Sequence, residues 1–373
     1  MKVLSLKLTF FFLIAVSFLK GQEGIIKWNE IAVVGDVPTS DDPARFGATY
    51  ARLQQINKKT WLAAYTVADQ RKDSSGRFRL HLDVARSDNN GRSWKKISQI
   101  SYYGRDLDNA QLIRLKNGDL LLSCRSTRFG ESYWLPVYVS RDKGISWIQL
   151  SMIDTNDGKP GQLFKPDKGL YEPHFYLPAD GRLGVMYANE KHVTETIGYS
   201  QIVSLKVSPD LGKTWGNERW AVYDSSSTSS RPGMPVWTKM ENGKYILVYE
   251  VCGPEKCNVY FKISDDGTNW PNGLGTVIPE QTAAPYILSM SNGTLLVTSN
   301  NGNISISDDY GISWQKAERP WQSKQEKEKV RHFTYWSSLY QMGKNEIGAV
   351  TSVLRAEGGQ NVQIRFGKPH RRK

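Results

Sequence analysis

The sequence predicts an all-β fold, a six-bladed β-propeller, and three observations support this prediction. A short motif, S-x-D-x-G-x-x-W, occurs five times in the 373 residues. A second pattern, an apolar segment followed by a tight turn and another apolar segment, occurs six times. The turns of the second pattern repeat at intervals of 50 to 63 residues, and recurrence at such a period is the signature of a repeat architecture.

The S-x-D boxes indicate a repeated β-hairpin. Complete copies begin at Ser140, Ser208 and Ser307, while Ser87–Trp94 carries Asn89 at the Asp position and Ser264–Trp270 is one residue shorter. In such a turn Asp accepts backbone hydrogen bonds, Gly permits a positive φ, and Trp packs beneath the hairpin. We therefore expect the boxes to be structural.

The second pattern predicts the inner hairpin of each unit. The turns fall at positions 58, 117, 180, 242, 292 and 344, and four of them are Asn-Gly or Asp-Gly between hydrophobic residues. Each turn except the last is followed by a box, so each unit holds four strands. The last unit lacks its box, and we expect residues 25–34 to supply its outer strand and to close the ring.

The N-terminus predicts export. Lys2 and Lys7 precede the apolar run Leu8–Leu19. This 12-residue run is as long as a secretory h-region and shorter than a membrane span. We expect residues 1–21 to be a signal peptide, residues 22–373 to be a single propeller domain, and the protein to be secreted or periplasmic. No later segment of the sequence suits a membrane span.

Cysteines and charge add little to the choice of function. Cys252 and Cys257 can close a loop disulfide or stay reduced, and both alternatives remain open; without a His cluster they make a poor zinc site. Cys124 lies in an apolar strand pattern and is expected to be buried. The net charge of +12 sits largely at the two chain ends, and no basic stripe interleaved with aromatics predicts nucleic-acid binding.

Antiparallel geometry predicts where functional side chains gather. If the first strand of each unit is innermost, its start and the end of the second strand lie together, about eight residues from each turn. This count gives two carboxylates in adjacent units, Glu172 and Glu250. Two converging carboxylates are the minimum set for glycoside hydrolysis. Two structural glutamates, paired with cations such as Arg231 and Lys191, are the alternative, and spacing alone leaves both open.

Further polar and aromatic residues map to the same end of the units. Aromatic faces suit the C–H surfaces of sugars, and Arg, Asn and Asp can hold hydroxyl groups in a fixed orientation. For each residue a satisfied loop contact is the alternative. The candidate substrate-binding residues are Arg45, Asp106, Asp108, Arg125, Asn189, Lys191, Arg231, Tyr335 and Trp336.

The boxes resemble the Asp-boxes of the sialidase-like superfamily of propellers. A narrower resemblance lies in G-L-Y-E-P-H-F-Y-L-P-A-D-G-R-L (169–183), Y-A-N-E-K-H (187–192) and the block S-R-P-G-M-P-V-W-T-K-M-E-N-G-K-Y-I-L-V-Y-E-V-C-G (230–253). These segments are similar to the exo-arabinanases of glycoside hydrolase family 93. The similarity is good over about residues 170–255 and weaker elsewhere.

This resemblance implies a specific activity. Family members are six-bladed propellers that release arabinobiose from the non-reducing end of α-1,5-linked arabinan with retention of configuration, using two glutamates and no metal or cofactor. The resemblance implies Glu172 and Glu250 as this pair, with Glu172 the nucleophile and Glu250 the acid/base. A plant cell-wall polysaccharide or oligosaccharide would be the substrate, and we expect a monomer.

Two other functions remain open. An exo-sialidase would use an arginine triad, a Tyr–Glu pair and an Asp acid; the chain has candidate arginines and Tyr335 but lacks the Arg-Ile-Pro segment expected near the first unit. A non-catalytic carbohydrate-binding propeller would need no glutamate pair.

Overall fold

The computed structural model describes residues 25–36, 47–72, 78–178, 180–321, 334–355 and 359–369. The signal-peptide prediction and Arg45 lie outside these residues. The described chain is almost entirely β-strand, with one short 3₁₀ helix, η1 (Lys191–Thr194). Within this part of the chain, no helix has the length and apolar character needed to cross a membrane.

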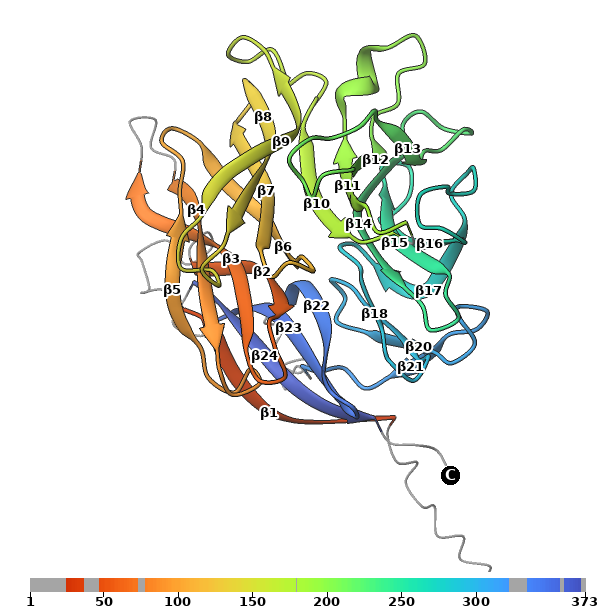
Figure 1. Cartoon of the computed structure of the whole chain (residues 1–373). Coiled ribbons are helices and arrows are strands. Elements are labelled where there is room, and N and C mark those ends of the chain that lie inside the picture. The colour runs from red at the N-terminus through yellow and green to blue at the C-terminus, as the bar shows by residue number, and fades with distance from the viewer. Residues whose placement is uncertain are drawn as a thin grey trace, which may run out of the picture.

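Four-stranded antiparallel sheets are arranged in a ring (Figure 1), and residues of their inner strands line a cavity in the central channel. Strand order within each sheet follows the chain, as expected for consecutive hairpins. The first two sheets contain β6 (Asp106–Arg114), β7 (Leu120–Arg128), β8 (Ser132–Ser140) and β9 (Ile148–Asp157), and then β10 (Leu170–Tyr176), β11 (Leu183–Asn189), β12 (Ile202–Ser208) and β13 (Arg219–Val222). The next two contain β14 (Arg231–Lys239), β15 (Tyr245–Cys252), β16 (Asn258–Ser264) and β17 (Thr276–Thr282), and then β18 (Tyr286–Ser289), β19 (Leu295–Thr298), β20 (Ile304–Ser307) and β21 (Gln315–Ala317).

An eight-stranded sheet joins the two ends of the chain. Its strands are β2 (Gly47–Gln55), β3 (Trp61–Lys72), β4 (Phe78–Ser87) and β5 (Lys95–Ile100), together with β22 (Thr334–Gly343), β23 (Glu346–Leu354), β24 (Gln360–Pro369) and β1 (Ile26–Gly35). A single parallel bridge, Gly47 to Gln360, connects the two halves. β1 pairs antiparallel with β24 (Figure 1), which confirms the prediction that residues 25–34 supply the last outer strand.

The S-x-D boxes form the expected local turns. In the copy at Ser140, the Ser140 hydroxyl donates to Asp142 Oδ1 at 2.8 Å, and the Gly144 amide donates to the Ser140 hydroxyl at 2.8 Å. The Trp147 indole donates to the Gly144 carbonyl at 3.2 Å. In the copy with Asn89, the Asn89 side-chain oxygen accepts the Ser93 amide at 2.9 Å, so the amide replaces the carboxylate without loss of the turn.

Five of the inner strands have a bulge near their first residues. Ordinary pairing is interrupted there in β2, β6, β10, β14 and β22, whereas β18 pairs without a register shift. Residues other than glycine rarely adopt positive φ, and such strain is kept where the surrounding structure enforces it. The residues that lie eight positions before the six turns all have φ between 44° and 59°. They are Tyr50, Asn109, Glu172, Met234, Ala284 and Trp336.

Candidate active site

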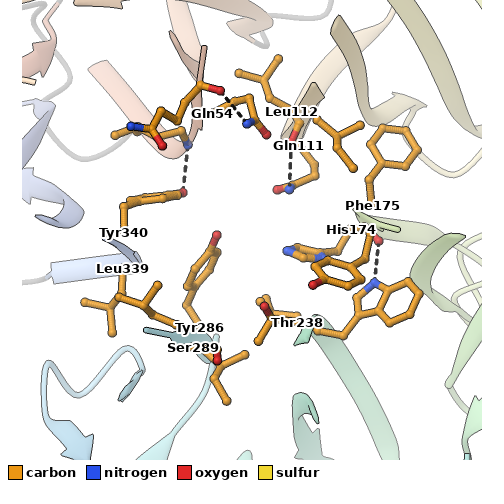
Figure 2. Close-up of a pocket in the computed structure, with 18 of the residues that line it drawn as sticks. Gln54, Gln111, Leu112, His174, Phe175, Thr238, Tyr286, Ser289, Leu339 and Tyr340 are labelled. Atoms are coloured by element: carbon orange, nitrogen blue, oxygen red, sulfur yellow. Dashed lines mark hydrogen bonds between the residues drawn. The ribbon is translucent and has the colours of Figure 1, made fainter. Parts of the chain in front are cut away.

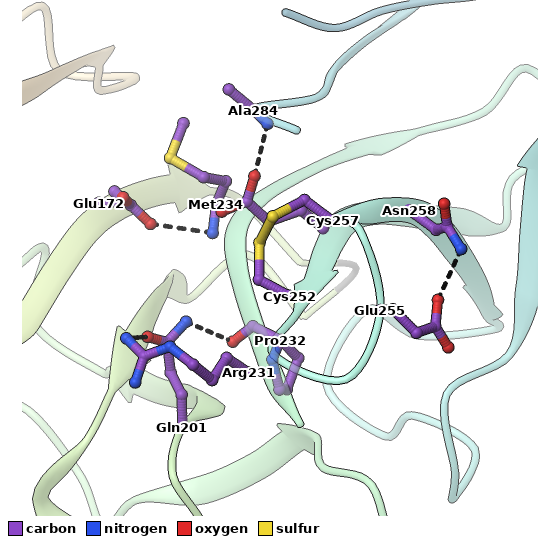
Figure 3. Close-up of a disulfide and its surroundings, with 11 residues drawn as sticks. Glu172, Gln201, Arg231, Pro232, Met234, Cys252, Glu255, Cys257, Asn258 and Ala284 are labelled. Atoms are coloured by element: carbon purple, nitrogen blue, oxygen red, sulfur yellow. Dashed lines mark hydrogen bonds between the residues drawn. A yellow bond between two sulfur atoms is a disulfide. The ribbon is translucent and has the colours of Figure 1, made fainter. Parts of the chain in front are cut away.

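The two predicted carboxylates each accept a hydrogen bond from a backbone amide of the following sheet, at the bulge of β14 and just before β18. Glu172 lies in β10, and its Oε2 accepts the Met234 backbone N–H at 2.9 Å. Glu250 lies in β15, and its Oε2 accepts the Ala284 N–H at 2.6 Å. Figure 3 shows the hydrogen bond from Met234 to Glu172 and the one that Ala284 donates. Each carboxylate thus has one fixed oxygen.

The two carboxylates are electrostatically coupled. Burial raises the pKa of Glu172 to about 8, and repulsion from Glu250 adds to this shift, while the Met234 amide and Arg125 oppose it. Burial also raises the pKa of Glu250, against the Ala284 amide and Arg231. Repulsion between two neighbouring carboxylates disfavours the state in which both are ionised, and the raised pKa of Glu172 favours a proton on that residue.

Gly233 keeps the space beside the pair open. It is the register partner of Glu250 on β14. A Cβ at Gly233 would lie 3.7 Å from Glu172 Oε2 and 2.4 Å from the Gln201 side-chain nitrogen. Any larger residue there would displace Gln201 and enter the space next to both carboxylates.

Glu250 occupies a position that has a structural role in neighbouring sheets. At the equivalent end of the second strand, Asn300 Oδ1 accepts the Trp336 N–H at 2.7 Å, and the Ser352 hydroxyl accepts the Tyr50 N–H at 3.1 Å. Neutral Asn and Ser therefore suffice to bind a bulge amide. A carboxylate in a partly desolvated position costs more than either, which favours a chemical use for Glu250.

Asp108 and Arg125 adjoin Glu172 and bind each other. Arg125 Nη2 donates to Asp108 Oδ2 at 2.8 Å. Asp108 Oδ1 accepts the Thr66 hydroxyl at 2.6 Å and its own neighbour's amide, Asn109 N–H, at 2.7 Å. Through these contacts the Arg125 charge is fixed where it lowers the pKa of Glu172.

Aromatic side chains form the opposite side of the mouth. Tyr335 and Trp336 have ring centroids 5.3 Å apart, and Trp336 lies 6.1 Å from Tyr50. Trp336 packs on the buried cluster of Tyr50, Met234 and Ala284. Both members of the pair 335–336 are partly exposed, as a sugar-stacking surface requires.

Two candidate residues do not reach this mouth. Asn189 is fully buried, and its amide donates to Ser204 at 3.1 Å and Glu218 at 3.2 Å. Asn189 was predicted to bind substrate, but its side chain contacts residues of its own sheet instead. Lys191, also a predicted substrate-binding residue, pairs through its ammonium with Asp154 of β9 at 2.6 Å, between two sheets.

Asp106 and Arg231 lie near the mouth in other environments. Asp106 accepts the Leu80 amide at 3.0 Å and lines a separate surface cavity of about 310 Å³ with Arg79 and Arg128. Arg231 donates to the buried Glu190 and to Gln201, yet its charge still lowers the pKa of Glu250. Arg231 therefore acts on the pair electrostatically.

A deeper cavity of about 280 Å³ lies further along the channel, toward the turn end of the inner strands (Figure 2). It is lined by neutral residues, among them Gln54, Gln111, His174, Tyr286 and Tyr340. Both ring nitrogens of His174 lack a protein hydrogen-bond partner in the described structure. Burial lowers the pKa of His174 to about 3, with a smaller effect from Arg52, so the imidazole is neutral.

Selection by carboxylate alone missed part of the site. Met234 and Ala284 lie at positions that the same residue count gives, but their side chains are apolar, and they contribute through their backbone N–H groups. Gln201 carried no sequence signal, because it reaches the site from β11–β12 through Arg231 and the Pro232 carbonyl. The open alternative for Cys252 and Cys257 is resolved as a disulfide, and Cys124 is buried and unpaired, as expected.

No protein-family profile and no curated protein sequence matches the chain. Solved structures do match. An α-L-arabinanase of Penicillium chrysogenum complexed with arabinobiose superposes with a TM-score of 0.73 at 23% identity, covering 91% of this chain and 98% of that one. A family 93 α-L-arabinofuranosidase of Fusarium graminearum with arabinobiose gives 0.68 at 21% identity, covering 91% and 97%.

A Hadza microbial sialidase is similar at a lower level, with a TM-score of 0.58 and 14% identity, covering 86% of this chain and 65% of that one. At such identities the likeness concerns the fold. The resemblance to family 93 within the sialidase-like propellers is thus confirmed as a resemblance of architecture.

Proposed function

We propose that this protein is a retaining exo-glycosidase that releases arabinobiose from the non-reducing end of α-1,5-linked arabinan. The observation that carries the proposal is the pair of carboxylates Glu172 and Glu250. Repulsion from Glu250 raises the pKa of Glu172, and each carboxylate accepts a hydrogen bond from a backbone amide. The pair lies in a fold similar to arabinanases whose structures contain arabinobiose.

In the proposed mechanism Glu172 attacks the anomeric carbon and Glu250 protonates the leaving oxygen. The C–O bond breaks, a glycosyl ester forms on Glu172, and Glu250 then removes a proton from the water that hydrolyses it. In the free pair burial favours the proton on Glu172. Substrate binding must therefore transfer it to Glu250, which sits beside the leaving oxygen in this arrangement.

Surrounding residues have supporting roles in this proposal. Arg125, fixed by Asp108, stabilises the ionised Glu172. Trp336 and Tyr335 provide aromatic faces for the sugar ring. Arg231 stabilises Glu250 when it is ionised after proton donation.

The remaining expectations belong to the same proposal. We propose that the eight-stranded sheet is two blades joined at one bridge, which gives six blades in total. Residues 1–21 would direct export, and residues 22–373 would form one catalytic domain that acts as a monomer on plant cell-wall arabinan.

The decisive experiment is the product profile on linear debranched arabinan. We expect arabinobiose alone from the earliest times, with the α-configuration seen by NMR before mutarotation. No release from arabinan or arabino-oligosaccharides would refute the substrate, and cleavage of a sialoside instead would favour a sialidase.

The roles of the two glutamates are separable by chemical rescue. Azide should restore turnover of an activated aryl arabinoside by Glu172→Ala with an inverted glycosyl azide, and by Glu250→Ala with a retained one. The reverse pattern would exchange the two roles, and full activity in either variant would remove that residue from the site.

A further inference from the structure

A disulfide lies directly against Glu250. Cys252 ends β15 two residues after Glu250, so both side chains point to the same face of the strand. Cys257 precedes β16, and the two cysteines are bonded across the hairpin loop (Figure 3). Both sulfur atoms and a carboxylate oxygen of Glu250 lie within 4.8 Å of one another. The disulfide is therefore an apolar wall on one side of the carboxylate.

A second connection links the same loop to the carboxylate through the backbone. The Ala283 N–H donates to the Cys257 carbonyl at 2.8 Å, and the next amide, Ala284 N–H, donates to Glu250 Oε2. Ala283 and Ala284 have φ of 59° and 44°, a conformation that residues other than glycine rarely adopt. Such a conformation persists only where its surroundings enforce it.

The loop itself supplies little other support. Gly253, Pro254 and Lys256 are exposed. Glu255 accepts from Asn258 at 2.8 Å and from Tyr260 at 2.6 Å, which ties its middle to β16 but not to β15. The bond between Cys252 and Cys257 is a direct covalent cross-link, in addition to the backbone of the loop, between the strand that carries Glu250 and the residue that binds Ala283.

We propose that the Cys252–Cys257 disulfide is a positioning group for Glu250, which holds its carboxylate against the Ala284 amide and excludes water from that side. The inference rests on the proposed function of Glu250 as acid/base. Misplacement of a reacting group by about 1 Å lowers turnover by about 100-fold. Opening the disulfide should therefore lower kcat more than it changes KM.

The charged groups that face Glu250 come from neighbouring strands. Arg231 on β14 lowers its pKa, and Glu172 on β10 is coupled to it by repulsion. Burial outweighs the Ala284 amide and Arg231, and raises the pKa of Glu250. Because opening the loop hydrates the carboxylate while leaving these charges in place, the pKa of Glu250 should fall toward its ordinary value.

The first test is reduction of the intact protein with excess dithiothreitol. The disulfide gains two electrons and two protons to give two thiols, and the reagent becomes its cyclic disulfide. We expect kcat on arabinan to fall about 10- to 100-fold, with KM changed less than about 3-fold. The variant Cys252→Ser/Cys257→Ser should equal the reduced protein and should not respond to the reagent. Cys124→Ala is the matched control and should respond as the unmodified protein does.

A second measurement separates positioning from general loosening. Aryl arabinobiosides with a 2,4-dinitrophenolate leaving group need no proton donor, so their first step should be spared, whereas alkyl or sugar leaving groups should show the full loss. Equal loss on both substrates would indicate a merely structural disulfide and would overturn the proposal.

A third measurement does not depend on activity. The pKa of Glu250, followed by carboxyl ¹³C NMR, should fall when the disulfide is reduced, and an unchanged pKa with unchanged kcat would overturn the proposal. If the intact protein fails to cleave arabinan, the proposed function fails, and the NMR comparison still tests whether the disulfide positions the carboxylate.

Discussion

The two ends of the central channel are built from the same inner strands and differ in charge. At the mouth, Arg125 lies near Glu172 and Arg231 near Glu250. The Oε2 atom of each carboxylate accepts one backbone amide. The cavity of about 280 Å³ around His174, called the lower cavity below, is lined by neutral residues, and His174 itself is neutral.

A cation separates the two levels. Arg52 is 2% exposed and lies 4.1 Å over the Tyr50 ring and 5.3 Å from the centre of the Tyr286 ring. Its guanidinium donates to the Trp336 carbonyl at 2.9 Å. Cavity volume is therefore a poor guide to chemistry here: the lower cavity is lined by neutral residues, whereas the mouth has the coupled charges that acid–base catalysis needs.

The largest expected difference is catalytic. Glu250→Ala should lower kcat on arabinan by about 10³-fold or more, because the leaving oxygen loses its proton donor. The variant His174→Gln, in the lower cavity, should keep a kcat within about 3-fold of that of the unmodified protein. Initial rates on linear arabinan measure both, and a comparable loss in the two variants would remove the distinction between mouth and cavity.

A smaller difference should follow from steric blocking. Gly233→Val places carbon atoms beside both carboxylates and displaces Gln201, so we expect kcat/KM to fall about 10- to 100-fold. Thr238→Val, further along the same strand and in the lower cavity, is the matched control and should retain activity. Unfolding curves of both variants show whether a loss reflects the site or the fold.

The two ends should also respond oppositely to pH. Glu172 has a raised pKa of about 8, so the folded state holds a proton that the unfolded state releases above its ordinary pKa, and stability falls as pH rises from about 4.5 to 8. Glu172→Gln should remove this loss, which is on the order of 4 kcal/mol at pH 8.

His174 should show the opposite dependence. Its pKa of about 3 means that only the unfolded state gains a proton between pH 6.5 and 3, so stability falls as pH falls. His174→Gln should therefore gain relative stability in acid, whereas Glu172→Gln gains it near pH 8. Urea unfolding at pH 4.5, 6.5 and 8 measures both, and parallel curves for the two variants would contradict the assigned environments.

The smallest effect concerns the strained backbone of the mouth. Ala284→Gly should stabilise the fold by about 0.5 kcal/mol, because glycine adopts a φ of 44° without steric cost. Ala64→Gly, a buried residue within β3, should instead lose about 1 kcal/mol or more. Thermal unfolding compares the two, and destabilisation by Ala284→Gly would show that its conformation is not strained.

The sequence by itself determined the repeat, its boundaries and the positions that face the mouth. The periodic turns and boxes are local signals, since Asn-Gly turns and Asp-box hydrogen bonds are made within a few residues, and they predicted the hairpins and the closing strand β1. The same count placed Glu172 at the positive-φ position of its inner strand, and Glu250 at the end of a second strand, where it accepts the Ala284 amide.

Tertiary structure decided which of those residues reach the site. Asn189 and Lys191 fit the count, but their side chains are bound by Glu218 and Asp154, from strands that only the fold brings close. The amides of Met234 and Ala284, the Gln201 contact and the Cys252–Cys257 disulfide likewise depend on packing between adjacent strands and sheets. Local periodicity determines the position of a residue on its strand, whereas the contacts of its side chain and its pKa depend on neighbours that are distant in sequence.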